Sequence, residues 1–114
     1  MTDKKEDQDP KEHLPRLEIE YCVACRWLLR AGWLAQEILT TFPVELAEVA
    51  LVPGRTPGRF EIRIDGQTVF SRGQEGRFPE AKEIKQIVRD VVDPQRDLGH
   101  SDSTYSDRAS RNKI

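Results

Sequence analysis

The chain has 114 residues and a net charge of −2, which allows one domain of ordinary size. No apolar run approaches the roughly 18 residues that span a bilayer, and no region is strongly basic, so neither a membrane nor a nucleic acid is the expected partner. Because no apolar segment follows the first lysines, as it would in a secretory signal, we expect a cytoplasmic protein.

Polar residues are concentrated at the two ends of the chain. Charged residues dominate 1–13, and 94–114 contains few apolar side chains, whereas 14–93 has an ordinary globular composition. We therefore predict a disordered charged leader over 1–13, a folded domain over 14–93 and a flexible polar tail over 94–114.

The first half of the domain begins with a predicted strand and a predicted helix. Apolar residues at every second position indicate a strand over Arg16–Tyr21, and helical spacing of apolar residues indicates a helix over Arg26–Phe42. Val44–Val52 is rich in small and branched apolar residues, which indicates a more buried strand. Leu29 and Trp33 fall on the polar side of the helix, either as a docking patch for a partner or as ordinary surface residues.

The second half is predicted as a hairpin, a loop and a helix. Arg59–Ile64 and Gln67–Ser71 flank Asp65-Gly66, a strong signal for a tight turn between two strands. Arg72–Arg77 is expected to be a loop, and a second helix opens at Phe78-Pro79.

The predicted order β-α-β-β-β-α indicates an α+β two-layer sandwich. A β-α-β crossover makes the first two strands parallel, and the hairpin adds two antiparallel strands, giving a four-stranded mixed sheet. Since the first and third strands each carry one charged face, one side of the sheet should be wet, and both helices should cover the other side.

A CxxC motif, Cys22-Val23-Ala24-Cys25, stands where the first strand meets the first helix. Two cysteines at this spacing close a small disulfide ring, and an exposed helix N-terminus stabilises the thiolate that attacks a disulfide. A structural role and a zinc half-site are the alternatives. Zinc normally takes four ligands, however, and His13 and His100 lie outside the predicted domain, so we predict no metal and no cofactor.

The predicted topology brings three other loops to the end of the sheet that carries the cysteines. Residues there are candidates for binding the substrate, and the arginines among them suit an anionic partner such as glutathione or serve as ordinary solvated surface. The candidate binding residues are Arg26, Thr56, Pro57, Gly58, Gly73 and Gly76.

Several segments carry a family resemblance. The junction Tyr21–Trp27, the strand segment Gly58–Ile62, the hairpin arm Gly66–Arg72, the segment Gly76–Lys85 and the tail segment Arg96–Asp102 together resemble the selenoprotein W/T/H (Rdx) family, most closely its bacterial members that use cysteine. The resemblance implies a thioredoxin-like fold and thiol redox chemistry linked to glutathione.

The resemblance leaves the attacking sulfur open. In thioredoxin-like enzymes the first cysteine, here Cys22, usually attacks, whereas selenoprotein W relatives carry selenocysteine at the second position, here Cys25. The main hypothesis is therefore a thiol–disulfide oxidoreductase that uses both cysteines on a protein disulfide, a protein thiol or glutathione. The alternative is a non-catalytic, redox-sensing binding module of the same fold, and a weak homodimer is compatible with both.

Overall fold

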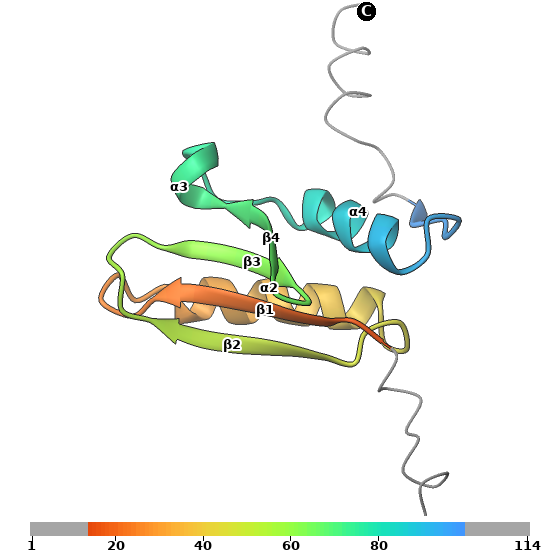
Figure 1. Ribbon diagram of the computed structural model, residues 1–114, viewed down its shortest axis with the longest axis horizontal. Helices are drawn as coiled ribbons and strands as arrows, with labels where there is room; N and C mark the ends of the chain where they lie inside the picture. Colours follow the sequence, from red (N-terminus) through yellow and green to blue (C-terminus); the bar gives the residue numbers. More distant parts are fainter. Residues whose placement is uncertain (1–13, 100–114) are drawn as a thin grey trace, which may run out of the picture.

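The structure, a computed structural model, describes residues 14–99 (Figure 1). Its strands are β1 (Arg16–Cys22), β2 (Glu48–Gly54), β3 (Phe60–Ile64) and β4 (Gln67–Ser71), and its helices are α2 (Leu28–Thr41), α3 (Arg72–Glu75) and α4 (Ala81–Val92). The predicted leader over 1–13, and the predicted tail from residue 100 onward, lie outside the described residues. Within 14–99, no helix has the length and apolar character required to cross a membrane.

The four strands form one mixed sheet in the order β2-β1-β3-β4. β1 and β2 are parallel, with Cys22 opposite Gly54, while β3 is antiparallel to both β1 and β4. β1, β2 and β4 therefore end on the side of the sheet where β3 begins. We call this side the cysteine end, formed by residues 22–27, 54–59 and 72–77.

The hydrophobic core lies between one face of the sheet and the helices. β1 and β3 each bury every second residue, as the predicted alternation requires, and α2 and α4 bury residues three or four positions apart. Lys85 Nζ on α4 donates a hydrogen bond to Glu37 Oε1 on α2 at 2.9 Å, so the two helices are also tied to each other. The predicted α+β two-layer sandwich is confirmed, and α2 runs behind β1 in Figure 1.

The other face of the sheet carries a ladder of charged side chains. Arg63 donates hydrogen bonds to Glu18 at 2.8 Å and to Glu61 at 3.2 Å, and it lies 3.0 Å from Glu20. The hydrogen bond from Arg63 holds the pKa of Glu18 below its usual value, although burial acts in the opposite direction. The wet face expected from the charged sides of the first and third strands is therefore present, and ion pairs cross it between β1 and β3.

Replacing Glu18 with glutamine is expected to reduce the pH dependence of stability in acid. Because the pKa of Glu18 is lowered on folding, its ion pair stabilises the protein above the unfolded value of about 4.3 and is lost as the pH falls below it. Urea unfolding at pH 7 should show E18Q less stable than the wild type by about 0.5–1.5 kcal/mol. At pH 3 the difference in stability between E18Q and the wild type should be smaller. An equal gap at both values would contradict this assignment.

The second strand differs from its prediction in position and in burial. It begins at Glu48, because the segment after Pro43 first forms a turn in which Leu46 is buried and the N–H of Ala47 donates to the carbonyl of Pro15 at 2.8 Å. β2 lies at an edge of the sheet, so most of its residues remain partly exposed despite their apolar character.

The segment predicted as a loop after β4 contains one helical turn, α3. Gly76 ends this turn with a φ of 74°, a left-handed conformation that glycine adopts without steric cost. Its N–H donates to the carbonyl of Arg72 at 2.7 Å.

The predicted domain ends at Asp93, but residues that follow Asp93 still contact the folded domain. Arg96 donates a hydrogen bond to the carbonyl of Thr41 at 2.6 Å, pairs with Glu45, and lies 4.9 Å above the ring of Phe42. A guanidinium at this position satisfies a free carbonyl at the C-terminal end of α2. Leu98 also packs against the core.

Candidate functional site

Cys22 and Cys25 are joined as a disulfide at the cysteine end of the sheet. Cys22 is the last residue of β1, Cys25 lies in the turn that follows, and their Cα atoms are 5.3 Å apart. The backbone N–H of Cys25 also donates a hydrogen bond to Cys22 Sγ at 3.2 Å. An N–H directed at this sulfur stabilises its thiolate form once the disulfide is reduced.

The two cysteines differ in exposure, which corrects in part the expectation that the motif stands at an exposed helix N-terminus. Only 1% of Cys22 is exposed, because it belongs to the end of a central strand, whereas Cys25 is partly exposed. The pair is therefore accessible from solvent through Cys25.

Helix α2 begins later than predicted, because the turn that holds the cysteines continues beyond Cys25. Arg26 has a φ of 61°, a left-handed conformation that cannot continue into a helix, and Trp27 is the N-cap of α2. The N–H of Arg26 donates to the carbonyl of Val23 at 2.9 Å. The CxxC motif is thus held in a turn of its own, ahead of the first helical residue, Leu28.

The adjacent strand β2 approaches the CxxC turn closely. The N–H of Val23 donates to the carbonyl of Gly54 at 3.2 Å. A Cβ on Gly54 would lie 2.6 Å from a carboxylate oxygen of Glu20 and 3.0 Å from the carbonyl of Tyr21. The absence of a side chain at Gly54 therefore lets β2 pair with the segment that carries Cys22.

Four of the candidate binding residues line one pocket of about 200 Å³: Thr56, Pro57, Gly58 and Gly73. The two other candidates lie elsewhere. Arg26 lines a separate pocket with Trp27 and residues of α2, and Gly76 ends α3. The candidate residues that the topology brings to the cysteine end therefore do not share one pocket.

An aromatic cluster that the sequence pattern did not predict lies behind the CxxC turn. Trp27, Phe60 and Phe78 meet edge to face, with ring centroids 4.7–6.4 Å apart. Arg30 and Arg72 lie over the ring of Phe78, at 3.9 and 4.7 Å from its centroid. This cluster connects the N-cap of α2 to the start of β3 and to the segment before α4.

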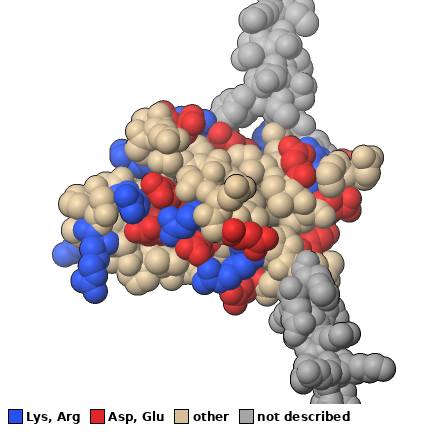
Figure 2. Space-filling model, viewed as in Figure 1, with Lys and Arg blue, Asp and Glu red and all other residues tan. Residues whose placement is uncertain are grey.

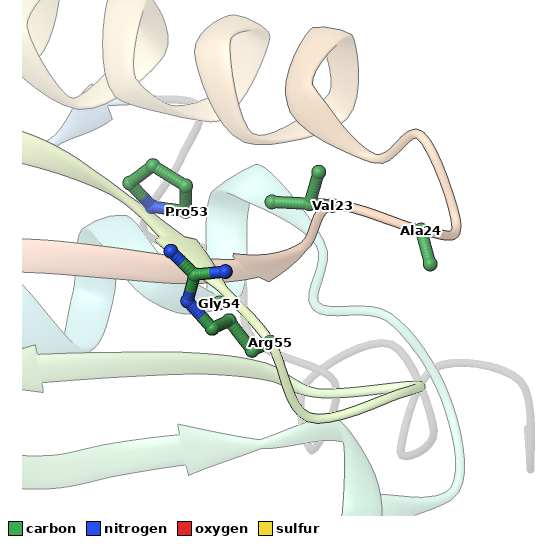
Figure 3. Close-up of a pocket in the computed structure, with 5 residues that line it drawn as sticks. All are labelled: Val23, Ala24, Pro53, Gly54 and Arg55. Carbon is green, nitrogen blue, oxygen red and sulfur yellow. The ribbon is translucent and has the colours of Figure 1, made fainter.

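A third pocket, of about 500 Å³, lies between the CxxC turn and the end of β2 (Figure 3). It is lined by Val23, Ala24, Pro53, Gly54 and Arg55. In Figure 3 the guanidinium of Arg55 turns back toward Pro53 and Gly54, along the wall of the pocket. Among residues 14–99, no group of three or more His, Cys, Asp or Glu side chains is arranged to hold a metal ion.

Solved structures of similar proteins share this fold. A protein from Bordetella parapertussis is 54% identical, with a TM-score of 0.68 over 70% of this chain and 100% of the other. A selenoprotein W-related protein from Vibrio cholerae is 51% identical, with a TM-score of 0.68 over 71% of this chain and 100% of the other.

Two mammalian relatives match over a shorter part of their length. Migration and invasion enhancer 1 of Bos taurus is 36% identical over 77 residues, which are 68% of this chain and 64% of that protein. The same protein of Mus musculus is 37% identical over 71 residues, 62% of this chain and 59% of that protein. The match thus spans about three fifths of these relatives.

The Rdx family model matches residues 16–90, which include β1, the CxxC turn and all but the last two residues of α4. This match covers more than half of the chain, and it agrees with the selenoprotein W-related neighbour and with the cysteine pair, which together support a function of redox type. The chain therefore belongs to the Rdx family.

Proposed function

We propose that the protein exchanges thiols and disulfides with a partner through Cys22 and Cys25, and that Cys25 is the attacking sulfur. The single observation that carries this proposal is the difference in exposure across one closed pair: Cys25 is partly exposed, and Cys22 is buried beneath it. A partner sulfur that approaches from solvent meets Cys25 first.

The exchange takes two steps. The Cys25 thiolate attacks one sulfur of the partner's disulfide, forms a mixed disulfide and releases the other partner sulfur as a thiolate. The Cys22 thiolate then attacks the Cys25 sulfur and releases the second partner thiolate. The partner disulfide gains two electrons, the protein becomes the Cys22–Cys25 disulfide, and the protons lost by the two protein thiols pass through solvent to the partner.

The hydrogen bond from the Cys25 N–H suits the second step. Burial disfavours a charged sulfur, but a backbone donor at 3.2 Å offsets part of that cost at Cys22. The resolving sulfur is thereby kept close to Cys25 and out of contact with solvent.

Glutathione is the proposed reductant that completes the cycle. Two glutathione thiols would reduce the Cys22–Cys25 disulfide and leave as glutathione disulfide, which suits a cytoplasmic protein in a reducing compartment. Among the described residues, Arg26, Arg55 and Arg72 of the cysteine end form no ion pair with an acidic side chain, which favours an anionic thiol.

The test uses the reduced Cys22→Ser and Cys25→Ser variants with dipyridyl disulfide and, separately, with glutathione disulfide. C22S should stop at a stable mixed disulfide on Cys25, which intact-mass and peptide mass spectrometry locate. C25S should react at least about tenfold more slowly, because its remaining thiol is buried.

The wild type and the double Cys→Ser variant are the controls. The wild type should pass through the adduct to the internal disulfide, and the double variant should form no adduct. An adduct that accumulates on Cys22 in C25S, with little on Cys25 in C22S, would reverse the assigned roles.

A further inference from the structure

Two pockets are lined by residues that precede and follow Cys25 in the chain. The pocket of about 500 Å³ includes Val23 and Ala24, and a pocket of about 450 Å³ begins at Arg26. The second pocket is lined by Arg26, Trp27, Leu29, Arg30 and Trp33. Along the chain, the partly exposed Cys25 thus separates residues that line one pocket from residues that line the other, so a segment bound at Cys25 can contact the lining of both.

Large apolar side chains are exposed around both pockets. Leu29 is 86% exposed and Trp33 is 52% exposed on α2, and Val23 is 50% exposed in the CxxC turn. A group of exposed apolar residues beside a reactive centre is typical of a surface that another protein covers. Leu29 and Trp33, on the polar side of the predicted helix, are therefore part of a larger surface that reaches the cysteines.

Positive charge without a partner surrounds the same surface. Among residues 14–99, four arginines of the cysteine end and the first turn of α2 form no ion pair with an acidic side chain: Arg26, Arg30, Arg55 and Arg72. The arginines over the sheet differ, because Arg16, Arg59 and Arg63 are all paired with glutamates. In Figure 2, basic atoms gather where β1 and β2 end, whereas acidic and basic atoms mix over the sheet.

Two of these arginines are held in place by aromatic rings. Arg72 lies 5.0 Å from the ring centroid of Trp27 and shares the ring of Phe78 with Arg30. The Nε of Arg72 is buried and has no hydrogen-bond partner among the described residues. Stacking on aromatic rings holds a guanidinium group in one orientation, which preorganises it to bind a carboxylate.

We propose that the partner presented to Cys25 is an extended protein segment whose cysteine is flanked on both sides by carboxylate residues and by large apolar residues. This inference rests on the proposed function and names its substrate class. The carboxylates would pair with the free arginines, and the apolar side chains would cover Val23, Leu29 and Trp33. A tripeptide thiol supplies the negative charge but carries no large apolar side chain to cover this surface, so the geometry favours a protein.

The test measures how fast the reduced wild-type protein attacks short synthetic peptides with one central cysteine carried as a pyridyl disulfide. Attack by Cys25 forms the peptide mixed disulfide and releases pyridine thione, whose absorbance gives the rate. Three peptides share leucine and tryptophan positions and differ only in carrying glutamate, glutamine or lysine. The glutamate peptide should react about tenfold faster than the glutamine peptide at low salt, and the advantage should shrink at high salt.

Charge-reversal variants test the assigned residues. Arg30→Glu and Arg55→Glu should lose the preference for the glutamate peptide and gain one for the lysine peptide. Lys82→Glu on α4 changes the net charge equally and lines neither pocket, so it should keep the wild-type preference. All rates are divided by the rate with dipyridyl disulfide, which corrects for any change in the reactivity of the thiolate itself.

Several outcomes would overturn the inference. One is that the wild type reacts at equal rates with the three peptides, and another is that K82E loses the preference for the glutamate peptide as fully as R55E does. A third is that a glutathione pyridyl disulfide reacts as fast as the glutamate peptide. Leu29→Ser combined with Trp33→Ser should lower the rate for every peptide several-fold, and an unchanged rate would also count against it. A protein that fails even with dipyridyl disulfide would instead contradict the proposed function.

Discussion

Replacing Phe60 with alanine is expected to lower the free energy of unfolding by about 3–5 kcal/mol, measured by urea unfolding followed by circular dichroism. Phe60 is fully buried, stands opposite Tyr21 across β1 and β3, and meets the rings of Trp27 and Phe78. Its removal would leave a cavity and separate the sheet from the N-cap of α2. Because small domains are stable by only about 5–15 kcal/mol, this variant is expected to be close to unfolding.

Two further variants keep this prediction measurable. Phe60→Leu fills most of the cavity but loses both edge-to-face contacts, so it should cost less than F60A. Val44→Ala also shortens an apolar side chain, but Val44 is 73% exposed, so stability should change by no more than about 0.5 kcal/mol. A cost in F60A no larger than that in V44A would contradict the assignment of Phe60 to the core beneath the site.

Replacing Gly54 with alanine is expected to destabilise the protein by about 1–3 kcal/mol, because the added methyl group would meet Glu20 and the carbonyl of Tyr21. The carboxylate of Glu20 can swing away only by weakening its ion pairs with Arg59 and Arg63. The backbone carbonyl of Tyr21 can move only if β1 moves beside Cys22. Unfolding of the oxidised protein in urea measures the cost.

Gly32 provides a matched control for the same chemical change. It lies within α2, and a Cβ built there meets no atom within 4 Å. Gly32→Ala should therefore raise the free energy of unfolding by about 0.5–1 kcal/mol, since alanine is the better helix former. The two substitutions should thus differ in sign, and a stabilising G54A would show that the close approach of β2 to the cysteine segment is not required.

The sequence predicts the sheet well because apolar and polar residues alternate along a strand that has one buried face. β4 has the predicted bounds, and β1 differs from its prediction by one residue. The position of Cys22 and Cys25 at the end of β1 follows from the same alternation. Parallel pairing of β1 with β2 then places the loop after Gly54 beside them, as the topology requires.

The features that distinguish the two cysteines could not be predicted from local pattern. The burial of Cys22 depends on the strands and side chains packed around the end of β1, and the start of α2 depends on the left-handed backbone at Arg26. The edge position of β2 has no local signal either, because an apolar run looks the same in a central strand.

The aromatic cluster also could not be predicted from local pattern, because its residues are far apart in the sequence. Trp27, Phe60 and Phe78 come from the N-cap of α2, from β3 and from the segment before α4, and only the folded chain brings them together. Their signal in the sequence is the position of each ring beside a turn at the cysteine end. That signal becomes informative only after the order of the strands is known.

The proposed function requires Cys22 and Cys25 to cycle between a dithiol and a disulfide under conditions that a reducing compartment can reach. A redox titration in glutathione buffers, with thiol trapping and peptide mass spectrometry, tests it directly. We expect one two-electron transition in which the Cys22–Cys25 peptide loses two hydrogens and no glutathione remains attached to the wild type. Two thiols that stay free across the whole titration, or a stable glutathione adduct in place of the internal disulfide, would contradict it.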